Sequence, residues 1–103
     1  MKAMNQTIAD LRASVLLSIQ RALLGVVSPS LRGVTVGWGE KQIRIICYFH
    51  GPVSDEDREA LGCAHSEIIA DFPDDYNVDL EIIREDSPLE LLPLQAWAYL
   101  RRE

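Results

Sequence analysis

The side chains in this sequence best suited to holding a metal ion are two cysteines and two histidines: Cys47, His50, Cys63 and His65. Two cysteines and two histidines are a ligand set of structural zinc sites. Their spacing argues against such a site. Cys47 and His50 are three residues apart on an expected strand, so they point to opposite faces. Cys63 and His65 are two residues apart on an expected helix, roughly 200° around it. We therefore expect no metal and no other cofactor.

A nucleophilic site is the second chemistry that these residue types allow. Cys63, His65 and Asp71 supply a thiol, an imidazole and an orienting carboxylate. No nucleophile elbow or glycine-rich oxyanion loop accompanies them. The glycines of residues 33–37 do not form a phosphate loop, because no lysine and no helix follow them. We interpret them as a bulge or a close backbone approach and expect no catalytic residues. A small enzyme that uses its carboxylates or Cys63 remains an alternative.

The elements that position these residues follow from apolar periodicity and turn signals. We expect a helix over 5–25, strands over 31–38 and 42–50, a helix from the cap at Ser54 to Pro73, and strands over 77–84 and 96–102. Asn5 or Thr7 can cap the first helix and Gly25 can stop it. The strict alternation of residues 77–84 is typical of a half-buried antiparallel strand.

The order α-β-β-α-β-β predicts the fold class α+β. We expect two layers, in which a four-stranded, mainly antiparallel sheet carries two helices on one face. The opposite sheet face would then be open to water or to a partner. A chain of 103 residues has room for one such core, so we expect a single domain over 1–103.

Composition narrows the classes of function. The net charge is −6, which argues against nucleic-acid binding as the main activity. The most apolar stretch, residues 15–27, is interrupted by Gln20 and Arg21 and is too short to span a bilayer. Two cysteines do not demand an oxidising compartment. We expect a cytoplasmic protein with no membrane partner; nothing in the sequence indicates the oligomeric state.

The distribution of charge is the informative feature. Residues 52–90 hold thirteen of the sixteen acidic residues and two of the ten basic ones. The acids concentrate on the second helix, the loop after it and the polar face of residues 77–84. Two interpretations stay open: a solvated face that keeps the protein soluble, and an electrostatic surface that steers a basic protein partner.

Aromatic residues extend the second interpretation. Trp97 and Tyr99 are expected to share a face of the last strand, and Tyr48 lies on the face opposite Phe49. If Ala98 and Leu100 face the helices, the three aromatic rings point outward beside the acids. Such a mixture resembles the composition of binding hot spots. The alternative places Trp97 in the core and Ala98 outside. The candidate partner-binding residues are Asp74, Asp75, Asp79, Glu81, Tyr48, Trp97 and Tyr99.

Three segments together resemble a known family. They are Tyr48-Phe49-His50-Gly51-Pro52-Val53-Ser54-Asp55-Glu56-Asp57, Glu67-Ile68-Ile69-Ala70-Asp71-Phe72-Pro73 and Tyr99-Leu100-Arg101-Arg102-Glu103. The sequence is similar over residues 31–103 to small bacterial immunity proteins of contact-dependent growth inhibition systems, which belong to the polymorphic toxin systems.

The resemblance implies a non-enzymatic cytoplasmic protein that binds and neutralises the toxin domain of its own strain's effector. Such toxins are often nucleases, and a nuclease is commonly basic because its substrate is a polyanion. The resemblance assigns no binding residue. An acidic interaction or regulatory domain unrelated to toxins remains the main alternative.

Overall fold

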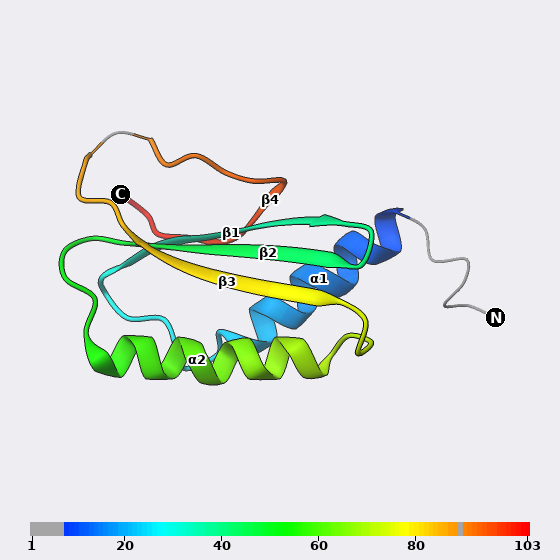
Figure 1. Ribbon diagram of the computed structural model, residues 1–103. Coiled ribbons are helices and arrows are strands. Elements are labelled where there is room, and N and C mark those ends of the chain that lie inside the picture. The colour runs from blue at the N-terminus through cyan, green and yellow to red at the C-terminus, as the bar shows by residue number, and fades with distance from the viewer. Residues whose placement is uncertain (1–7, 89) are drawn as a thin grey trace.

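A computed structural model describes residues 8–88 and 90–103 (Figure 1). The elements are α1 (Ile8–Ala22), β1 (Leu31–Gly39), β2 (Gln42–Phe49), α2 (Asp55–Ala70), β3 (Asn77–Arg84) and β4 (Ala96–Leu100). Their order confirms the predicted α-β-β-α-β-β succession. The expected caps Asn5 and Thr7 lie outside the described residues. No helix in the described part of the chain is long and apolar enough to cross a membrane.

The four strands form one sheet in the order β3-β2-β1-β4. β1 pairs antiparallel with β2 and with β4, whereas β2 and β3 are parallel. Both helices lie on the same side of the sheet (Figure 1). The predicted fold class, α+β with a mainly antiparallel sheet, is confirmed.

The antiparallel assignment of the third strand is wrong. β3 runs parallel to β2 because α2 carries the chain back along the sheet between them, which makes β2-α2-β3 a β-α-β unit. The 16 residues of α2 span about 24 Å, close to the length of an eight-residue strand. The alternation of apolar and polar residues indicates that one face of the strand is buried, but it does not indicate the direction of the strand.

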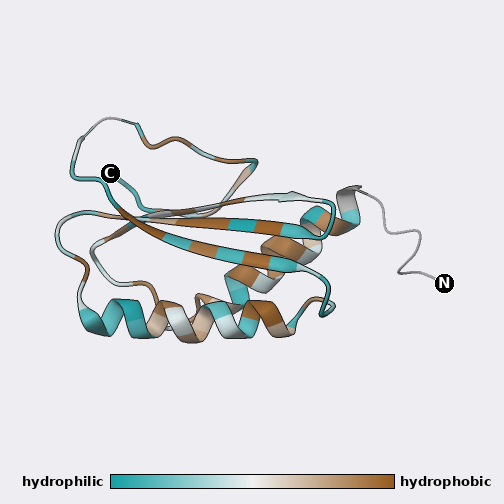
Figure 2. Cartoon of the chain, in the orientation of Figure 1, coloured by the Kyte–Doolittle hydropathy of each residue, from teal (hydrophilic) through white to brown (hydrophobic). Residues whose placement is uncertain are grey.

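The core fills the space between the helices and the inner face of the sheet. Alternate residues of β2 and β3 are apolar, which gives the banded strands of Figure 2. The most deeply buried apolar side chains are Val15, Ile19, Leu31, Val34, Val36, Ile43, Ile45, Cys47, Phe49, Leu61, Ala64 and Ile68. They come from both helices and from the two central strands, β1 and β2, so the helices are held by apolar packing on one face of the sheet.

Local signals fix the ends of both helices. Gly25 has φ +77°, the left-handed conformation that favours glycine and ends a helix, although the regular part of α1 stops earlier, at Ala22. Ser54 is the N-cap of α2, and its hydroxyl oxygen accepts a 3.0 Å hydrogen bond from the Asp57 backbone N–H. Three acidic residues follow in the first turn, where the helix dipole favours anions.

The face of the sheet turned away from the helices, here called the outer face, is partly covered. The chain between β3 and β4, residues 85–88 and 90–95 as described, crosses over it; we call this segment the crossover (Figure 1). Tyr48 donates from its hydroxyl to the Leu92 carbonyl at 3.0 Å. The Thr35 hydroxyl donates to Ala96 O at 2.7 Å and accepts from Leu94 N at 2.8 Å.

The expectation of an open outer face is therefore wrong for part of the sheet. Ile46 pairs with Thr35 on this face and is only 5% exposed. The outward side chains nearer the β1–β2 hairpin, including Gln42 and Arg44, are exposed. Leu91, which is buried, and Leu94, whose side chain lies over Gly37, supply apolar cover, and the hydroxyls of Thr35 and Tyr48 hold the segment in place. The outer face thus has a covered half and an open half.

Candidate partner-binding surface

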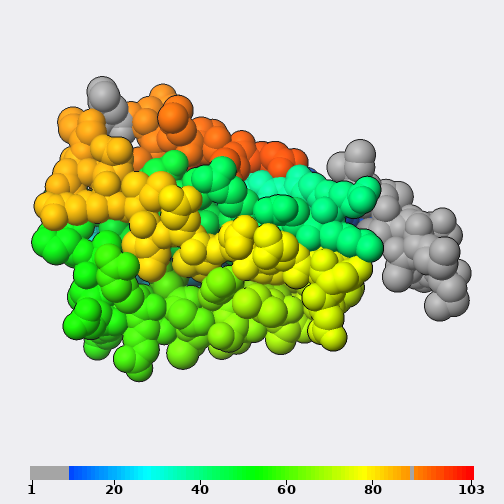
Figure 3. All heavy atoms as spheres, in the orientation of Figure 1, coloured from blue at the N-terminus to red at the C-terminus, as the bar shows by residue number. Residues whose placement is uncertain are grey.

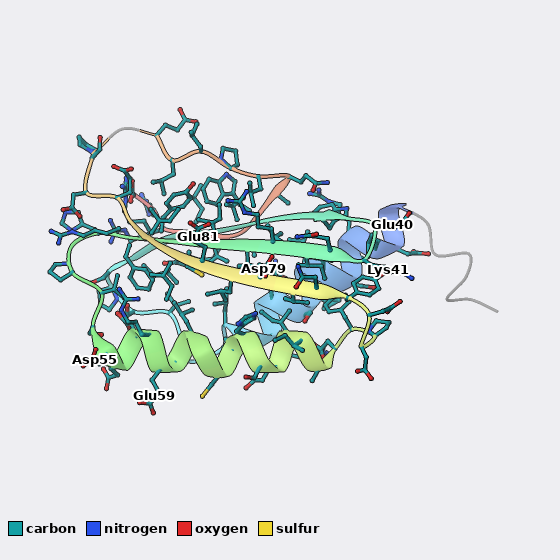
Figure 4. All side chains as sticks on the ribbon, viewed as in Figure 1. Glu40, Lys41, Asp55, Glu59, Asp79 and Glu81 are labelled. Carbon is teal, nitrogen blue, oxygen red and sulfur yellow. The ribbon has the colours of Figure 1, made fainter. Side chains whose placement is uncertain are left out.

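Two predicted acids, Asp79 and Glu81, lie on the open half of the outer face. Both are exposed, and they alternate along β3 with the inward-pointing Val78 and Leu80. Their register partners on β2 are Arg44 and Ile46, respectively. Figure 4 labels both acids on β3. Their predicted placement on the solvent side is confirmed.

Basic and amide side chains lie beside these acids. Arg44 donates to Glu81 at 3.3 Å, and the two side chains are 55% and 53% exposed. Asp79 accepts hydrogen bonds from the side-chain amides of Gln42, at 3.5 Å, and Asn77, at 3.3 Å. Exposed pairs of this kind contribute little to stability, about 0–1 kcal/mol. Asp79 is contacted only by uncharged amides, whereas Glu81 forms an exposed ion pair with Arg44 that a stronger partner could replace.

The loop before β3 adds two more acids. Lys41 lies 2.9 Å from Asp75, and its hydrogen bond holds the pKa of the Asp75 carboxyl below the ordinary value. The same contact raises the pKa of Lys41. Asp74 is exposed, and no described residue forms an ion pair with it. We call Asp74, Asp75, Asp79 and Glu81 the acidic strip. With Lys41 and Arg44 beside it, this surface keeps more negative than positive charge.

The outward placement predicted for the three aromatic rings is confirmed for Tyr48 and Trp97 and is wrong for Tyr99. Tyr48 and Trp97 lie together on the outer face, with ring centroids 6.4 Å apart and planes tilted by 53°. Tyr99 does not share their face. Trp97 pairs with Thr35, Tyr99 pairs with the next β1 residue, Val34, and the register shifts between these two pairs.

The physical reason is a β-bulge. β4 carries one extra residue, Ala98, between Trp97 and Tyr99, and an extra residue inverts the alternation of side chains. Tyr99 therefore packs against the core cluster, beside Val34. The condition that Leu100 faces the helices is not met, for the same reason, since Leu100 pairs with Gly33 and lies near it on the Trp97 side.

The aromatic pair and the acidic strip occupy different parts of the outer face. Tyr48 lies at the far end of β2 from the hairpin, beside Ile83, and it bonds to the crossover. Trp97 lines a shallow pocket with crossover residues Leu91 and Pro93. The structure thus divides the predicted site into an open acidic part and an aromatic part that supports the crossover.

Further acids, which the sequence analysis did not select as binding residues, lie on α2. Asp55, Glu56, Glu59 and Glu67 are exposed, and none forms an ion pair with a described residue. Figure 4 shows Asp55 and Glu59 at the lower side of α2, away from the sheet. Their concentration was visible in the charge distribution, but their direction depended on how α2 packs.

The cysteine and histidine side chains considered for metal binding and catalysis do not come together in one site. Cys47 is buried on the inner face, and burial raises the pKa of its thiol to about 12. Cys63 is exposed on α2. His65 donates from Nε2 to the Val78 carbonyl at 2.7 Å. Within residues 8–88 and 90–103, no three His, Cys, Asp or Glu side chains are grouped so that they could hold a metal ion.

Asp71, the proposed orienting carboxylate, joins the two helices instead. It accepts hydrogen bonds from Ser18, at 2.7 Å, and from Arg21, at 2.9 Å. The Ser18 hydrogen bond, and then that from Arg21, hold the pKa of Asp71 below its ordinary value. Ser18 is only 3% exposed, so its hydroxyl is a buried donor that Asp71 satisfies.

These features define a small α+β protein whose distinctive chemistry is exposed charge, and comparison with known families places it among the immunity proteins. The chain belongs to the MafI2 immunity protein family, whose model matches residues 12–103. No curated protein matches the chain. The resemblance is confirmed at the level of an immunity protein, and the match includes most of α1, which the resemblance had left out. The family does not identify a contact-dependent growth inhibition system.

Proposed function

We propose that this immunity protein neutralises a cognate toxin domain by binding it in the cytoplasm, without catalysis, and that the acidic strip meets a basic surface of that domain. The toxin domain would belong to an effector of a polymorphic toxin system, and a nuclease is the toxin class that fits best. The observation that carries the proposal is the exposure of Asp79 and Glu81 on a rigid strand in a member of an immunity family.

Electrostatics supports a basic partner. A nuclease must attract a polyanion, so its active surface is commonly rich in Lys and Arg. Charge complementarity raises association rates above the roughly 10⁵–10⁶ M⁻¹s⁻¹ of uncharged surfaces. Carboxylates already aligned on a strand lose little conformational entropy when they bind. Fast association is useful to an inhibitor that must reach a toxin before the toxin reaches its substrate.

Charge reversal on β3 tests the proposal. We expect the gene upstream to encode the effector, and the carboxyl-terminal toxin domain of that effector is the probe. Asp79→Lys with Glu81→Lys is the variant. The matched control is Glu59→Lys with Glu67→Lys, which changes the net charge equally at exposed positions of α2. Both variants should melt close to the parent, because exposed substitutions usually change stability by no more than about 0.5 kcal/mol.

We expect the β3 variant to associate more slowly, to dissociate faster, and to depend less on salt than the parent. The control should show only the smaller change in association rate that follows from altered net charge. A folded β3 variant with unchanged binding rates would remove the acidic strip from the interface. If the parent does not co-purify with the toxin domain at all, the immunity assignment to that toxin is wrong.

A further inference from the structure

β3 is an edge strand with a free side. Among the strands that the structure describes, it is the terminal one and pairs with β2 alone. Asn77 N donates to Lys41 O, and Glu85 N donates to Phe49 O, so the odd-numbered residues point their backbone groups toward β2. Successive residues of a strand point these groups to alternate sides. The N–H and C=O groups of Val78, Leu80 and Ile82 therefore point away from the sheet.

A side-chain contact confirms this direction. His65 of α2 donates to the carbonyl of Val78, which lies on the free side. Among the residues that the structure describes, none is recorded as a hydrogen-bond partner for the outward backbone groups of Leu80 or Ile82. In the space-filling view, β3 lies at the surface directly above α2 (Figure 3).

Natural edge strands are commonly protected from further pairing by charged side chains, especially Lys, by Pro or by a bulge. β3 reads Asn-Val-Asp-Leu-Glu-Ile-Ile-Arg and contains neither Lys nor Pro. Its register with β2 is continuous from Asn77 to Arg84, without a bulge. Beyond the His65 contact at Val78, the outward backbone groups of Leu80 and Ile82 are a template for pairing with another extended segment.

The two sides of this edge differ in chemistry. Asp79 and Glu81 project on the outer side. On the inner side Leu80 and Ile82 are half-buried, since only the helices cover them. Ile69 is 47% exposed and lies one helical turn after His65; because α2 and β3 run in opposite directions (Figure 1), this turn leads toward the Asn77 end of the edge. The edge of β3 is therefore acidic on its outer side and apolar on its inner side.

We propose that an extended segment of the toxin domain adds to the free edge of β3 as a fifth strand. Its side chains alternate: Lys or Arg opposite Asp79 and Glu81, and apolar residues against Leu80 and Ile82 and, toward the Asn77 end of the edge, against Ile69. This inference rests on the proposed function and specifies how the toxin is held. Backbone pairing supplies affinity, and the alternation supplies specificity.

A second copy of this chain fits the edge less well. Two β3 strands paired edge to edge would bring the Asp79 and Glu81 carboxylates of both copies together on one face, and like charges opposite each other destabilise a strand pair. A basic segment removes that repulsion. The charge of the edge thus selects the toxin segment as the occupant.

Residue-resolved amide hydrogen exchange, free and with the upstream-encoded toxin domain, tests the proposal. The Glu81 and Ile83 amides face β2 and should be protected in both states. The Leu80 and Ile82 amides should exchange rapidly in the free protein and at least about tenfold more slowly in the complex, because a new strand accepts their hydrogen bonds. Contacts made by side chains alone would not protect these two amides.

A variant pair adds an independent measurement. Ile69→Lys places a cation where the apolar side of the added strand lies, and we expect at least about tenfold weaker binding. Leu17→Lys is the matched control, an apolar helical residue that is 58% exposed on α1, and it should bind as the parent does. Thermal melts of both variants confirm that they fold.

The outcomes separate the two proposals. A complex that leaves the Leu80 and Ile82 amides unprotected overturns the added strand and leaves the immunity function intact. The absence of any complex overturns both. Protection of these amides in the free protein that grows with concentration identifies a second copy as the occupant and overturns the toxin segment.

Discussion

Arg32 and Glu103 are 71 residues apart in the chain and form two parallel hydrogen bonds, of 2.8 and 2.9 Å. Arg32 lies on β1 and is only 3% exposed. Its remaining terminal nitrogen donates to the carbonyls of Glu85, at 2.6 Å, and Ser87, at 2.9 Å. One buried guanidinium therefore joins the start of the crossover and the residues after β4 to the middle of the sheet. Bidentate pairs of this kind combine strength with a defined geometry.

The first prediction concerns pH. The hydrogen bond from Arg32 lowers the pKa of the Glu103 carboxyl from its ordinary 4.5 to about 2. A carboxyl with a depressed folded-state pKa stabilises the protein above its unfolded pKa, and this contribution is lost as the pH falls toward the folded value. We expect the stability difference between the parent and Glu103→Gln to be constant above pH 5 and to shrink between about pH 4.5 and 2.

Urea unfolding of both proteins from pH 2 to pH 7 measures this difference. Glu103→Gln is the appropriate reference for the parent, because every other carboxyl group titrates in the same way in the two proteins. A difference that stays flat through the acid range would show that Glu103 is not paired with Arg32 in solution. Arg32→Ala should lower the free energy of unfolding more than Glu103→Gln does, because it also leaves two crossover carbonyls without their hydrogen-bond donor.

The second prediction concerns the contact between Gly33 and Trp97. A Cβ at position 33 would lie 2.8 Å from Cζ3 of Trp97, closer than the packed ring allows. Gly33→Ala should therefore destabilise the protein by about 1–3 kcal/mol, the usual cost of overpacking. Gly39→Ala is the control, because a Cβ there meets nothing within 4 Å. Chemical denaturation measures both; equal stabilities would mean that Trp97 does not rest on Gly33.

The third prediction concerns the two thiols. Cys63 is exposed, whereas Cys47 is buried and its pKa is raised to about 12. The reactive species is the thiolate, so Cys47 should not react in the folded protein. A chromogenic disulfide reagent should titrate one thiol per native chain and two in denaturant. Cys63→Ala should abolish the native signal and should leave toxin neutralisation intact; a folded variant that fails to protect cells would favour an enzyme.

The fourth prediction concerns the joint between α1 and α2. Ser18→Ala removes a buried hydroxyl that donates to Asp71 at 2.7 Å, and we expect a loss of about 0.5–1.5 kcal/mol. The same change should raise the pKa of Asp71, since the Ser18 hydrogen bond is the largest cause of its depression. Ser66→Ala, at an exposed position of α2, is the control. An unchanged Asp71 titration by NMR would contradict the contact.

Patterns within one element were enough to predict much of this protein. The period of two in β3 places Asp79 and Glu81 on the solvent side, and the serine before three acids places the cap of α2 at Ser54. Both depend on the geometry of a few neighbouring residues, so no knowledge of the rest of the chain is needed. The same holds for the succession of helices and strands.

The relations between elements were decided only in the folded chain. The direction of β3 depends on the path of α2, the inversion of Tyr99 depends on a bulge against β1, and the cover of the outer face depends on the crossover being held by Arg32. Each of these contacts joins residues that are distant in sequence. Its free energy depends on the side chains and backbone groups of both segments, so the pattern of one segment does not determine it. The residue types set which side chains are apolar or charged; long-range pairing set which of them meet, and which remain exposed for a partner.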